Sequence, residues 1–254
     1  MDRAFEGRRI VVSGGCGGIG RAVVDALALE GARLFVLDLE ASIDSHPVPS
    51  GVCAVPMDGS NSGSVAQVFE QIEAEVDGLD GLVNLIGYAV ERQPVEAYTD
   101  ALWHDAIDGN LNSAFYVARA AMPLLRRGDA SSLVNISSGL ALKCVSGYGG
   151  YPVAKAGVMA LTRLLAQEAA PNVRANCVAP SAVETAFLSG GTGRGGDEPG
   201  RQRQLDGEAY LKTVPLARLA QPDDVVGPVL FLLSNASAYV TGQTLHVNGG
   251  SLMV

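Results

Sequence analysis

Short, nearly continuous runs of valine, isoleucine and leucine alternate with longer helical patterns along almost the whole chain. The apolar runs cover residues 9–13, 34–38, 52–57, 81–86, 132–136, 173–178 and 244–247. Strands that are apolar on both sides belong to parallel sheets whose two faces are covered by helices. The pattern therefore predicts an α/β fold: a doubly wound, Rossmann-type parallel sheet of about seven strands with helices on both faces. We expect a single domain over residues 1–254, because no linker or internal repeat interrupts the alternation.

One segment departs from this alternation. Residues 189–207 are rich in glycine and show no apolar periodicity. The segment follows the sixth apolar run, at the edge of the sheet where doubly wound folds bind their ligands. We therefore expect a mobile substrate lid near residues 186–213, and the alternative is a disordered surface insertion.

The composition narrows the class of protein and its partners. The chain has 254 residues and a net charge of −9 at pH 7. It contains no apolar run of the ~18 residues that a membrane helix needs, and its N-terminus lacks a signal-peptide pattern, which indicates a cytoplasmic protein. An acidic chain is a poor partner for nucleic acid, so we expect a small-molecule ligand and no membrane. Four widely spaced cysteines and three histidines predict neither a disulfide framework nor a metal site.

Glycines cluster where the first apolar run meets the first helical pattern. Gly14, Gly18 and Gly20, with Ile19 before the last of them, allow a tight turn and a close approach of backbone amides to a phosphate. A pyrophosphate there would also lie at the positive N-terminus of the helix. The strand–loop–helix context favours a dinucleotide site over a purely structural turn.

Polar residues and glycines follow the next three runs. Asp38 ends the second run, where a carboxylate accepts hydrogen bonds from the adenosine ribose and repels a 2′-phosphate. This residue predicts NAD rather than NADP, and a solvated strand-end aspartate is the alternative. Asp58 and Gly59 follow the third run, and Asn84 and Gly87 close the fourth. Both pairs are expected to contact the cofactor, unless they only form turns.

Tyr151 and Lys155 place a phenol and an ammonium group four residues apart at the start of a helical pattern. On a helix such residues share one face, with Cβ atoms roughly 5–6 Å apart. Lowering a tyrosine pKa from about 10 to about 7 needs about 4 kcal/mol, which one cation about 4 Å away supplies at an effective dielectric near 20. The pair is therefore a candidate acid/base switch, and an ordinary surface pair is the alternative.

Further motifs follow in order along the chain. Together with those above they are Ser13-Gly14-xxx-Gly18-Ile19-Gly20, Asn84-Leu85-Ile86-Gly87, Asn110, Ser137-Ser138, Tyr151-xxx-Lys155, the run from Pro180 to Thr185, and the ending from Thr241 to Gly250. In these motifs and their spacing the chain resembles the classical short-chain dehydrogenase/reductase family, from about Arg8 to the C-terminus. It departs from the usual family motifs at Ser13 (threonine), Leu85 (asparagine) and Ser181 (glycine).

The resemblance implies a role for each matching residue in the centre of the chain. Tyr151 is the general acid/base, and Lys155 lowers its pKa and hydrogen-bonds the nicotinamide ribose. Ser138, thirteen residues before Tyr151, holds the substrate oxygen. Asn110 organises a water that links Lys155 to solvent.

The remaining matches concern the nicotinamide and the substrate. Val183 and Thr185 are implied to contact the nicotinamide carboxamide. The neighbouring Ser137 and Tyr148 lack the family spacing and are not expected to take part in catalysis. The substrate pocket is expected between residues 88–93, the segment after Ser138, and the lid.

The implied activity is that of an NAD-dependent short-chain alcohol dehydrogenase or ketone reductase. Such an oxidoreductase transfers a hydride between the nicotinamide and a secondary alcohol or ketone. A 3-oxoacyl-thioester (acyl-carrier-protein) reductase is an alternative, suggested by the C-terminal motif, and a catalytically inactive nucleotide-binding scaffold is another. Family members commonly form dimers and tetramers, so a homo-oligomer, most simply a homotetramer, is expected. The substrate, the direction and the stereochemistry are not fixed by these residues.

Overall fold

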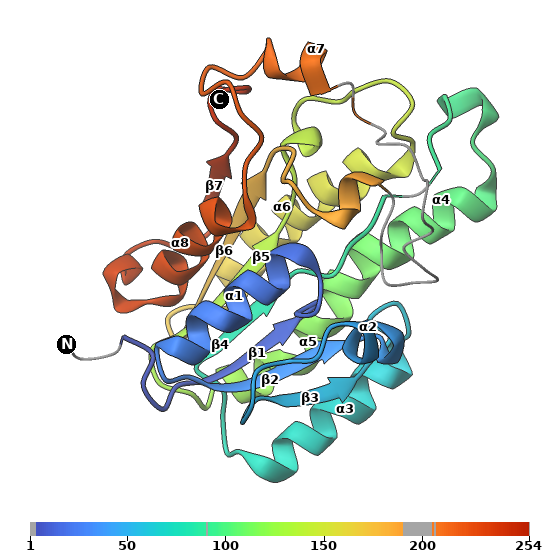
Figure 1. The fold of residues 1–254 in the computed structure, drawn as a ribbon. Coiled ribbons are helices and arrows are strands. Elements are labelled where there is room, and N and C mark those ends of the chain that lie inside the picture. The colour runs from blue at the N-terminus through green and yellow to red at the C-terminus, as the bar shows by residue number, and fades with distance from the viewer. Residues whose placement is uncertain (1–3, 90, 190–204, 206, 254) are drawn as a thin grey trace.

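The computed structural model describes residues 4–89, 91–189, 205 and 207–253. Within these residues seven strands form one parallel sheet in the order β3-β2-β1-β4-β5-β6-β7 (Figure 1). The strands are β1 (Arg9–Ser13), β2 (Arg33–Asp38), β3 (Cys53–Pro56), β4 (Gly81–Asn84), β5 (Ser131–Ile136), β6 (Val173–Pro180) and β7 (Thr244–Val247). The predicted doubly wound parallel sheet is confirmed.

Helices cover both faces of this sheet. On one face α1 and α8 pack together, and Leu27 and Leu232 are fully enclosed in the core beneath them. On the other face α3, α5 and α6 cover a second core that contains Phe69, Leu124 and Ala166. The described helices are α1 (Gly18–Leu29), α2 (Glu40–Ser45), α3 (Ser62–Glu75), α4 (Asp100–Ile107), α5 (Ser113–Leu125), α6 (Gly150–Ala169), α7 (Gly207–Leu211) and α8 (Pro222–Leu233).

The strand order reverses at the centre of the sheet, between β1 and β4. From β1 the chain moves outward through β2 and β3, whereas from β4 it moves to the other side as far as β7. Ser13 and Asn84, the last residues of the two central strands, lie opposite each other in register. In doubly wound sheets the crevice beyond such a reversal is the usual ligand site. The topology therefore brings the glycine loop after β1 and the segment after β4 to one place.

The helical segments beside this crevice differ from the prediction in detail. The helix α5 is preceded by a π-helical turn, η2 (Asp108–Asn112), that joins it to α4. A π-turn inserts an i→i+5 hydrogen bond without changing the apolar pattern on either side, so periodicity does not reveal it. The short helix α2 was also not expected.

The predicted lid over residues 186–213 is described only near its ends. The turn η4 (Ala186–Ser189) follows β6, and α7 follows later in the chain. Residues 190–204 and 206 lie outside the described part of the chain, so the lid stays a prediction.

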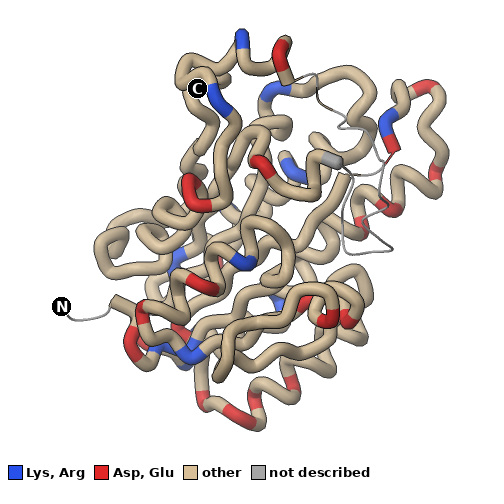
Figure 2. Tube along the Cα trace, viewed as in Figure 1, with Lys and Arg blue, Asp and Glu red and all other residues tan. Residues whose placement is uncertain are grey.

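Charged residues are distributed unevenly over the molecule. Figure 2 shows that acidic residues recur along α3 and near α2 and α4. No described helix combines the length and the apolar character that a membrane crossing requires. Across the described residues, no group of three or more His, Cys, Asp or Glu side chains is arranged to hold a metal ion.

Candidate active site

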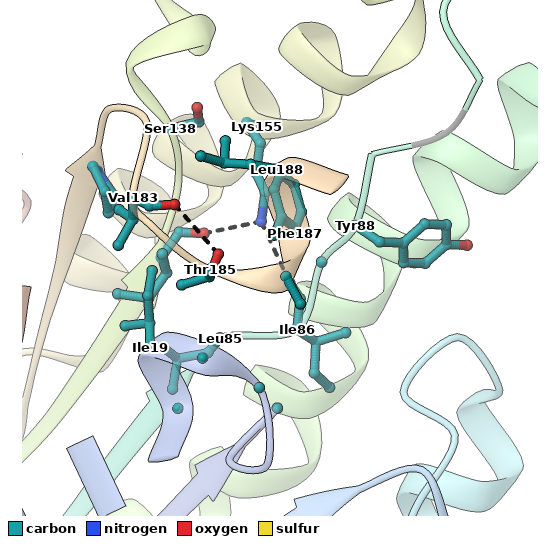
Figure 3. Close-up of a pocket in the computed structure, with 18 of the residues that line it drawn as sticks. Ile19, Leu85, Ile86, Tyr88, Ser138, Lys155, Val183, Thr185, Phe187 and Leu188 are labelled. Atoms are coloured by element: carbon teal, nitrogen blue, oxygen red, sulfur yellow. Dashed lines mark hydrogen bonds between the residues drawn. The ribbon is translucent and has the colours of Figure 1, made fainter. Parts of the chain in front are cut away.

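A cavity of about 980 Å³ lies at the carboxyl edge of the central strands. It extends from Asp38 and Asp58, which follow β2 and β3, past the glycine loop to Tyr151. Figure 3 shows its middle part, where Lys155, Phe187 and Thr185 lie above Ile19 and Leu85. The topology thus joins the predicted cofactor residues and the predicted acid/base pair in one space.

The glycine loop is crowded by backbone on its inner side. Gly14 has a φ of +73°, and a Cβ on it would lie 2.9 Å from the Leu85 carbonyl carbon. A Cβ on Gly18 would lie 2.5 Å from Thr185 Cγ2, and one on Gly20 would overlap the Gly14 carbonyl oxygen. Side chains are therefore excluded where the loop turns, which leaves backbone amides facing the cavity.

The N-terminus of α1 has the features of an anion site. No side chain caps its first amides, and its first turn contains no acidic residue. By contrast, the N-terminus of α3 is capped by Asn61, whose Oδ1 accepts hydrogen bonds from Gly63 and Ser64. Free amides and the helix dipole both favour a phosphate group at α1, so the loop fits the pyrophosphate of a dinucleotide.

Asp38 connects the end of β2 to the glycine loop. Its Oδ2 accepts a hydrogen bond of 2.9 Å from the Cys16 amide, and its Oδ1 accepts one of 2.8 Å from the Leu39 amide. The half-buried carboxylate still lines the cavity. These bonds fix the orientation of the carboxylate in the cavity, and its contact with a ribose hydroxyl stays a prediction.

Asp58 and Gly59 line the cavity beyond β3, and both have structural roles there. Asp58 Oδ1 accepts hydrogen bonds from the Ser60 amide at 2.9 Å and the Ser60 hydroxyl at 2.7 Å, which closes the turn. A Cβ on Gly59 would lie 2.5 Å from Ile86 Cδ1. The turn that the sequence left as an alternative is present, and contact with the cofactor stays a prediction.

Asn84 is buried at the end of β4 and does not line the cavity. Its Oδ1 accepts a hydrogen bond of 2.9 Å from Ser13 Oγ. Its Nδ2 donates to Asn135 Oδ1 at 3.3 Å and to the Ala114 carbonyl at 3.4 Å. The side chain therefore joins β1, β4, β5 and α5, and its predicted contact with the cofactor stays a prediction.

Asn110 is also fully buried and does not line the cavity. Its Nδ2 donates to the carbonyls of Tyr88 and Ala106, at 3.0 and 2.9 Å, and its Oδ1 accepts from the Tyr88 amide at 3.1 Å. All its side-chain groups are thus used by backbone partners. The side chain holds the segment after β4 against η2, and the expected role of organising a water stays a prediction.

Gly87 belongs to this same segment and lines the cavity. A Cβ on it would lie 2.5 Å from Lys155 Nζ and 2.6 Å from Asn110 Oδ1. Only glycine therefore allows Lys155 to reach the floor of the cavity.

Tyr151, Lys155 and Ser138 meet in the cavity wall. The first two come from the first turns of α6 and are buried, with 6% and 3% of their surface exposed. Lys155 Nζ donates hydrogen bonds to the carbonyls of Ile136 (3.1 Å) and Ile86 (3.4 Å), as the dashed lines in Figure 3 mark. Ser138 follows β5, and its Oγ accepts a hydrogen bond of 3.2 Å from the Leu140 amide. The structure thus brings together the three residues expected to act on the substrate.

The electrostatics of this group differ from the expectation. Burial raises the pKa of Tyr151 to about 12; a hydrogen bond with Ser138 opposes this, and Tyr148 adds to it. Burial likewise lowers the pKa of Lys155 to about 8. Lys155 Nζ lies 5.9 Å from the Tyr151 ring centroid and is held by backbone carbonyls, so it is farther from the phenol than the sequence argument assumed. Loss of hydration therefore outweighs the attraction of the cation for a phenolate.

Val183 and Thr185 lie on the loop after β6, above the glycine loop. Val183 is buried, and Thr185 Oγ1 donates a weak hydrogen bond of 3.4 Å to its carbonyl (Figure 3). Both residues line the cavity, which is where the nicotinamide half of a cofactor on the glycine loop would extend. Their predicted contact with the carboxamide fits this placement.

Several lining residues were not singled out from the sequence. The Phe187 ring lies 5.9 Å from the Tyr151 ring, and Leu188 follows it. Tyr210 and Leu252 also line the cavity, although they lie far along the chain. Phe187 and Leu188 fall within the predicted lid, but no spacing or composition signal marked Leu252.

Known proteins resemble the chain over its full length. A family model described as Enoyl-(Acyl carrier protein) reductase matches residues 14–251. The 3-oxoacyl-(acyl-carrier-protein) reductase FabG of Chlamydia pneumoniae is 32% identical over 257 residues, covering 98% of this chain and 99% of that protein. A Brucella melitensis protein, described as short-chain dehydrogenase/reductase SDR:Glucose/ribitol dehydrogenase, superposes with a TM-score of 0.87 at 30% identity over 100% of both chains.

A further solved structure is that of a short chain dehydrogenase from Leptospira borgpetersenii with bound NAD+. It has a TM-score of 0.84 and 26% identity, and the match covers 98% of this chain and 94% of that one. The family match, the full-length relatives and the site geometry agree. The chain therefore belongs to the classical short-chain dehydrogenase/reductase family of oxidoreductases, which use a nicotinamide cofactor.

Proposed function

We propose that this protein transfers a hydride reversibly between NAD and a secondary alcohol or ketone. The observation that carries the proposal is the buried phenol of Tyr151, which shares one cavity with Ser138, Lys155 and the glycine loop. A buried phenol beside a hydroxyl and an ammonium group suits proton transfer to or from a substrate oxygen.

Each of these side chains has a distinct task in the proposed reaction. When bound, the nicotinamide supplies the hydride acceptor or donor. In oxidation, Tyr151 Oη takes the hydroxyl proton of the substrate, and in reduction it returns that proton to the oxygen. Ser138 Oγ donates a hydrogen bond to the same oxygen as negative charge develops on it. Lys155 holds the ribose and favours the phenolate form of Tyr151.

The raised pKa of Tyr151 has a consequence for this scheme. At neutral pH a phenol with a pKa of about 12 is protonated, which is the form that donates a proton in reduction. Oxidation needs the phenolate, whose population rises about tenfold for each pH unit below the pKa. We therefore expect oxidation to gain rate as the pH rises towards the pKa of Tyr151, which the positive charge of the oxidised cofactor would lower in the complex.

The choice of NAD over NADP rests on Asp38. Its carboxylate lines the adenosine end of the cavity and is oriented by two backbone amides. A 2′-phosphate beside it would meet like charge, whereas ribose hydroxyls would find an acceptor. Arg21 also lines this end, from the exposed start of α1, so the preference depends on which of the two charges lies nearer the ribose. The bound NAD+ of the Leptospira structure supports the same choice.

The second candidate is a 3-oxoacyl-thioester reductase, which the FabG relatives favour. A large carrier-bound substrate would call for a basic surface at the cavity mouth. Arg126 and Arg127 lie instead at the end of α5, beside the residues that lead into β4. Arg126 donates to the Glu168 carbonyl and Arg127 pairs with Glu73 at 2.6 Å. Neither residue is therefore placed to dock a carrier protein at the cavity.

Steady-state kinetics separates the two candidates. The enzyme is assayed with NADH and NADPH against an acetoacetyl thioester, and with NAD and NADP against a panel of secondary alcohols. The proposed function predicts turnover of at least one alcohol with NAD and a kcat/KM for the thioester that is lower than for the matching small ketone. Faster reduction of the thioester, with NADPH preferred, would establish the second candidate instead.

A further inference from the structure

Arg92 brings to the cavity a positive charge that forms no ion pair with any described residue. It lies on the segment after β4 and lines the cavity together with Tyr148. Its guanidinium carbon is 3.9 Å from the centroid of the Tyr148 ring, and its Nη2 donates a hydrogen bond to the Tyr148 hydroxyl. A β-bridge between Gln93 and Tyr148 fixes the two segments side by side. Arg92 is therefore held in the cavity wall and not on a free surface.

Among the described residues, the contacts of the guanidinium are with Tyr148 and none is with an acidic group. In the described part of the chain, none of the ion pairs includes Arg92. Its Nε is enclosed, and no acceptor among the described residues reaches it. The adjacent acid, Glu91, is exposed and accepts a hydrogen bond from Gln93 at 3.0 Å. A buried N–H donor without an acceptor costs free energy, so binding an anion would stabilise this side chain.

The position of Arg92 relative to the reacting group is also informative. Tyr148, on which it stacks, is three residues before Tyr151, and both tyrosines line the cavity. Tyr148 is close enough to Tyr151 to affect its pKa electrostatically. An anion on Arg92 would therefore share the cavity with the substrate hydroxyl that meets Tyr151.

A second cation lines the same part of the cavity. Lys143 follows the turn η3 (Gly139–Ala141) and forms none of the ion pairs found among the described residues. Two of the acidic residues that line the cavity, Asp38 and Asp58, lie at its adenosine end, and Glu184 lies on the loop after β6. A chain with a net charge of −9 thus places two cations around the expected substrate position.

We propose that the substrate carries a carboxylate, which Arg92 binds through its guanidinium with Lys143 in support. This inference rests on the proposed function: the substrate is a hydroxy acid with a secondary hydroxyl within a few bonds of the carboxylate. Its carbinol hydride passes to NAD, its hydroxyl proton passes to Tyr151, and the product is the corresponding oxo acid. The carboxylate itself is unchanged. A planar guanidinium suits this group because its N–H donors match the two carboxylate oxygens.

Turnover of matched substrates tests the proposal. A panel of 2-, 3- and 4-hydroxy acids is compared with the corresponding primary amides and phosphate esters, with NAD as cofactor. For the best acid, wild-type kcat/KM should exceed that of its amide by about 10- to 100-fold, the range for one charge-assisted hydrogen-bonded contact. Arg92→Gln should remove most of this preference and leave the kcat/KM of the amide within about threefold. Equal rates for acid and amide in the wild type, or a preference for the phosphate esters, would overturn the carboxylate assignment.

Arg33→Gln is the matched control. Arg33 also stacks on an aromatic ring, that of Phe35, but it begins β2 at the opposite edge of the sheet and does not line the cavity. Its substitution should leave the preference for the acid unchanged. Loss of the preference in both variants would point to a general loss of structure and would contradict the role of Arg92.

A binding measurement separates this inference from the proposed function. Calorimetry with the NADH complex compares butanoate with butanamide, neither of which can react. Butanoate should bind about tenfold more tightly, and Arg92→Gln should abolish the difference. Tighter binding of butanoate without turnover of any alcohol would keep the anion site and refute the proposed function. Turnover of alcohols with equal binding of butanoate and butanamide would keep the proposed function and refute the anion site.

Discussion

Tyr148 and Tyr151 line the same cavity three residues apart, and their surroundings give them different tasks. Tyr151 is buried beside Ser138 and above Lys155, whereas the Tyr148 hydroxyl is engaged by Arg92. The sequence distinguishes them by spacing alone, since only Tyr151 has a lysine four residues later, and the catalytic role of Tyr151 stays a prediction. It gave no sign that Tyr148 would hold an arginine, because that contact joins segments 56 residues apart.

The residues of the acid/base group also show what spacing cannot predict. The positions of Tyr151 and Lys155 on one helical face follow from the i, i+4 rule. Their pKa values, however, depend on how far burial removes hydration, which spacing does not show. The buried amides of Asn84 and Asn110 illustrate the same limit. Both were expected near ligands because of where they lie in the sequence, and both are fully used in holding strands and helices together.

Lys155 should destabilise the protein at neutral pH. The fall of its pKa from 10.5 to about 8 corresponds to about 3 kcal/mol of burial cost. Below pH 8 both the folded and the unfolded protein carry the proton, so the cost is present in full. It declines between about pH 8 and 10.5, where the folded protein loses the proton first. The two carbonyls that would lose a donor in Lys155→Met reduce the expected gain to about 1–2 kcal/mol.

Urea unfolding of the protein without cofactor measures this effect. Lys155→Met should have a higher free energy of unfolding than the wild type at pH 7, and the difference should shrink by pH 10. Lys143→Met replaces an exposed lysine and serves as the control, with stability close to that of the wild type at both pH values. If the wild type is more stable than Lys155→Met at pH 7, burial of the Lys155 charge does not destabilise the protein as proposed.

Asp38→Asn should weaken the preference for NAD over NADP. The amide keeps the size of the side chain and removes the charge that repels a 2′-phosphate. We expect the ratio of kcat/KM for the two cofactors to fall by about 10- to 100-fold. Glu40→Gln removes a nearby charge that does not line the cavity, and it should leave the ratio unchanged. An unchanged ratio in Asp38→Asn would assign the preference to another group.

At the scale of the elements, most strands and helices could be predicted from the sequence because each has a clear apolar period. β5, for example, is buried at all six positions, which the run around Leu133 and Val134 already indicated. The π-turn η2 could not be predicted, since it changes the hydrogen bonding between α4 and α5 and not the residue pattern. The absence of a capping side chain at the start of α1 could be predicted, because glycines occupy the positions where such a side chain would lie.

The turn between β1 and α1 offers a test at this scale. Gly14 and Gly51 both have positive φ, at +73° and +85°, but only Gly14 is crowded by backbone; nothing lies within 4 Å of a Cβ on Gly51. Gly51→Ala should cost about 1–2 kcal/mol, or about 3–6 °C in Tm. Gly14→Ala should cost at least twice as much or prevent folding, because the Leu85 backbone must also move. Equal losses in thermal unfolding would show that the turn is not tightly packed.

At the scale of the whole molecule, the alternation of apolar runs predicted the sheet, and the reversal of strand order placed the site. What could not be predicted is which distant segments close the cavity. Leu252 reaches it from the C-terminal part of the chain, through packing that no local pattern encodes, whereas Tyr210 falls within the predicted lid. The assembly could not be predicted either. It depends on apolar residues at the surface, and a periodic pattern does not distinguish these from apolar residues in the core.

Exposed apolar side chains on α5 and α6 indicate where copies of the chain would meet. Phe115 is 40% exposed, and Leu164 is 52% exposed. We expect light scattering to give a mass of two or four chains of 26.2 kDa. Leu164→Glu should lower that mass, whereas Leu29→Glu, at a more exposed position on α1, should not. A wild-type monomer at micromolar concentration would contradict the expected assembly.

The central claim is that Tyr151 moves a proton in step with hydride transfer. The most direct measurement follows NAD reduction at the nicotinamide band with the best secondary alcohol, for the wild type, Tyr151→Phe and Tyr148→Phe. Tyr151→Phe should lose at least about 100-fold in kcat while binding NAD normally, because general acid/base catalysis contributes about 10²- to 10⁴-fold. Tyr148→Phe keeps the ring under Arg92 and should stay within about threefold of the wild type. Substantial turnover by Tyr151→Phe would contradict the claim.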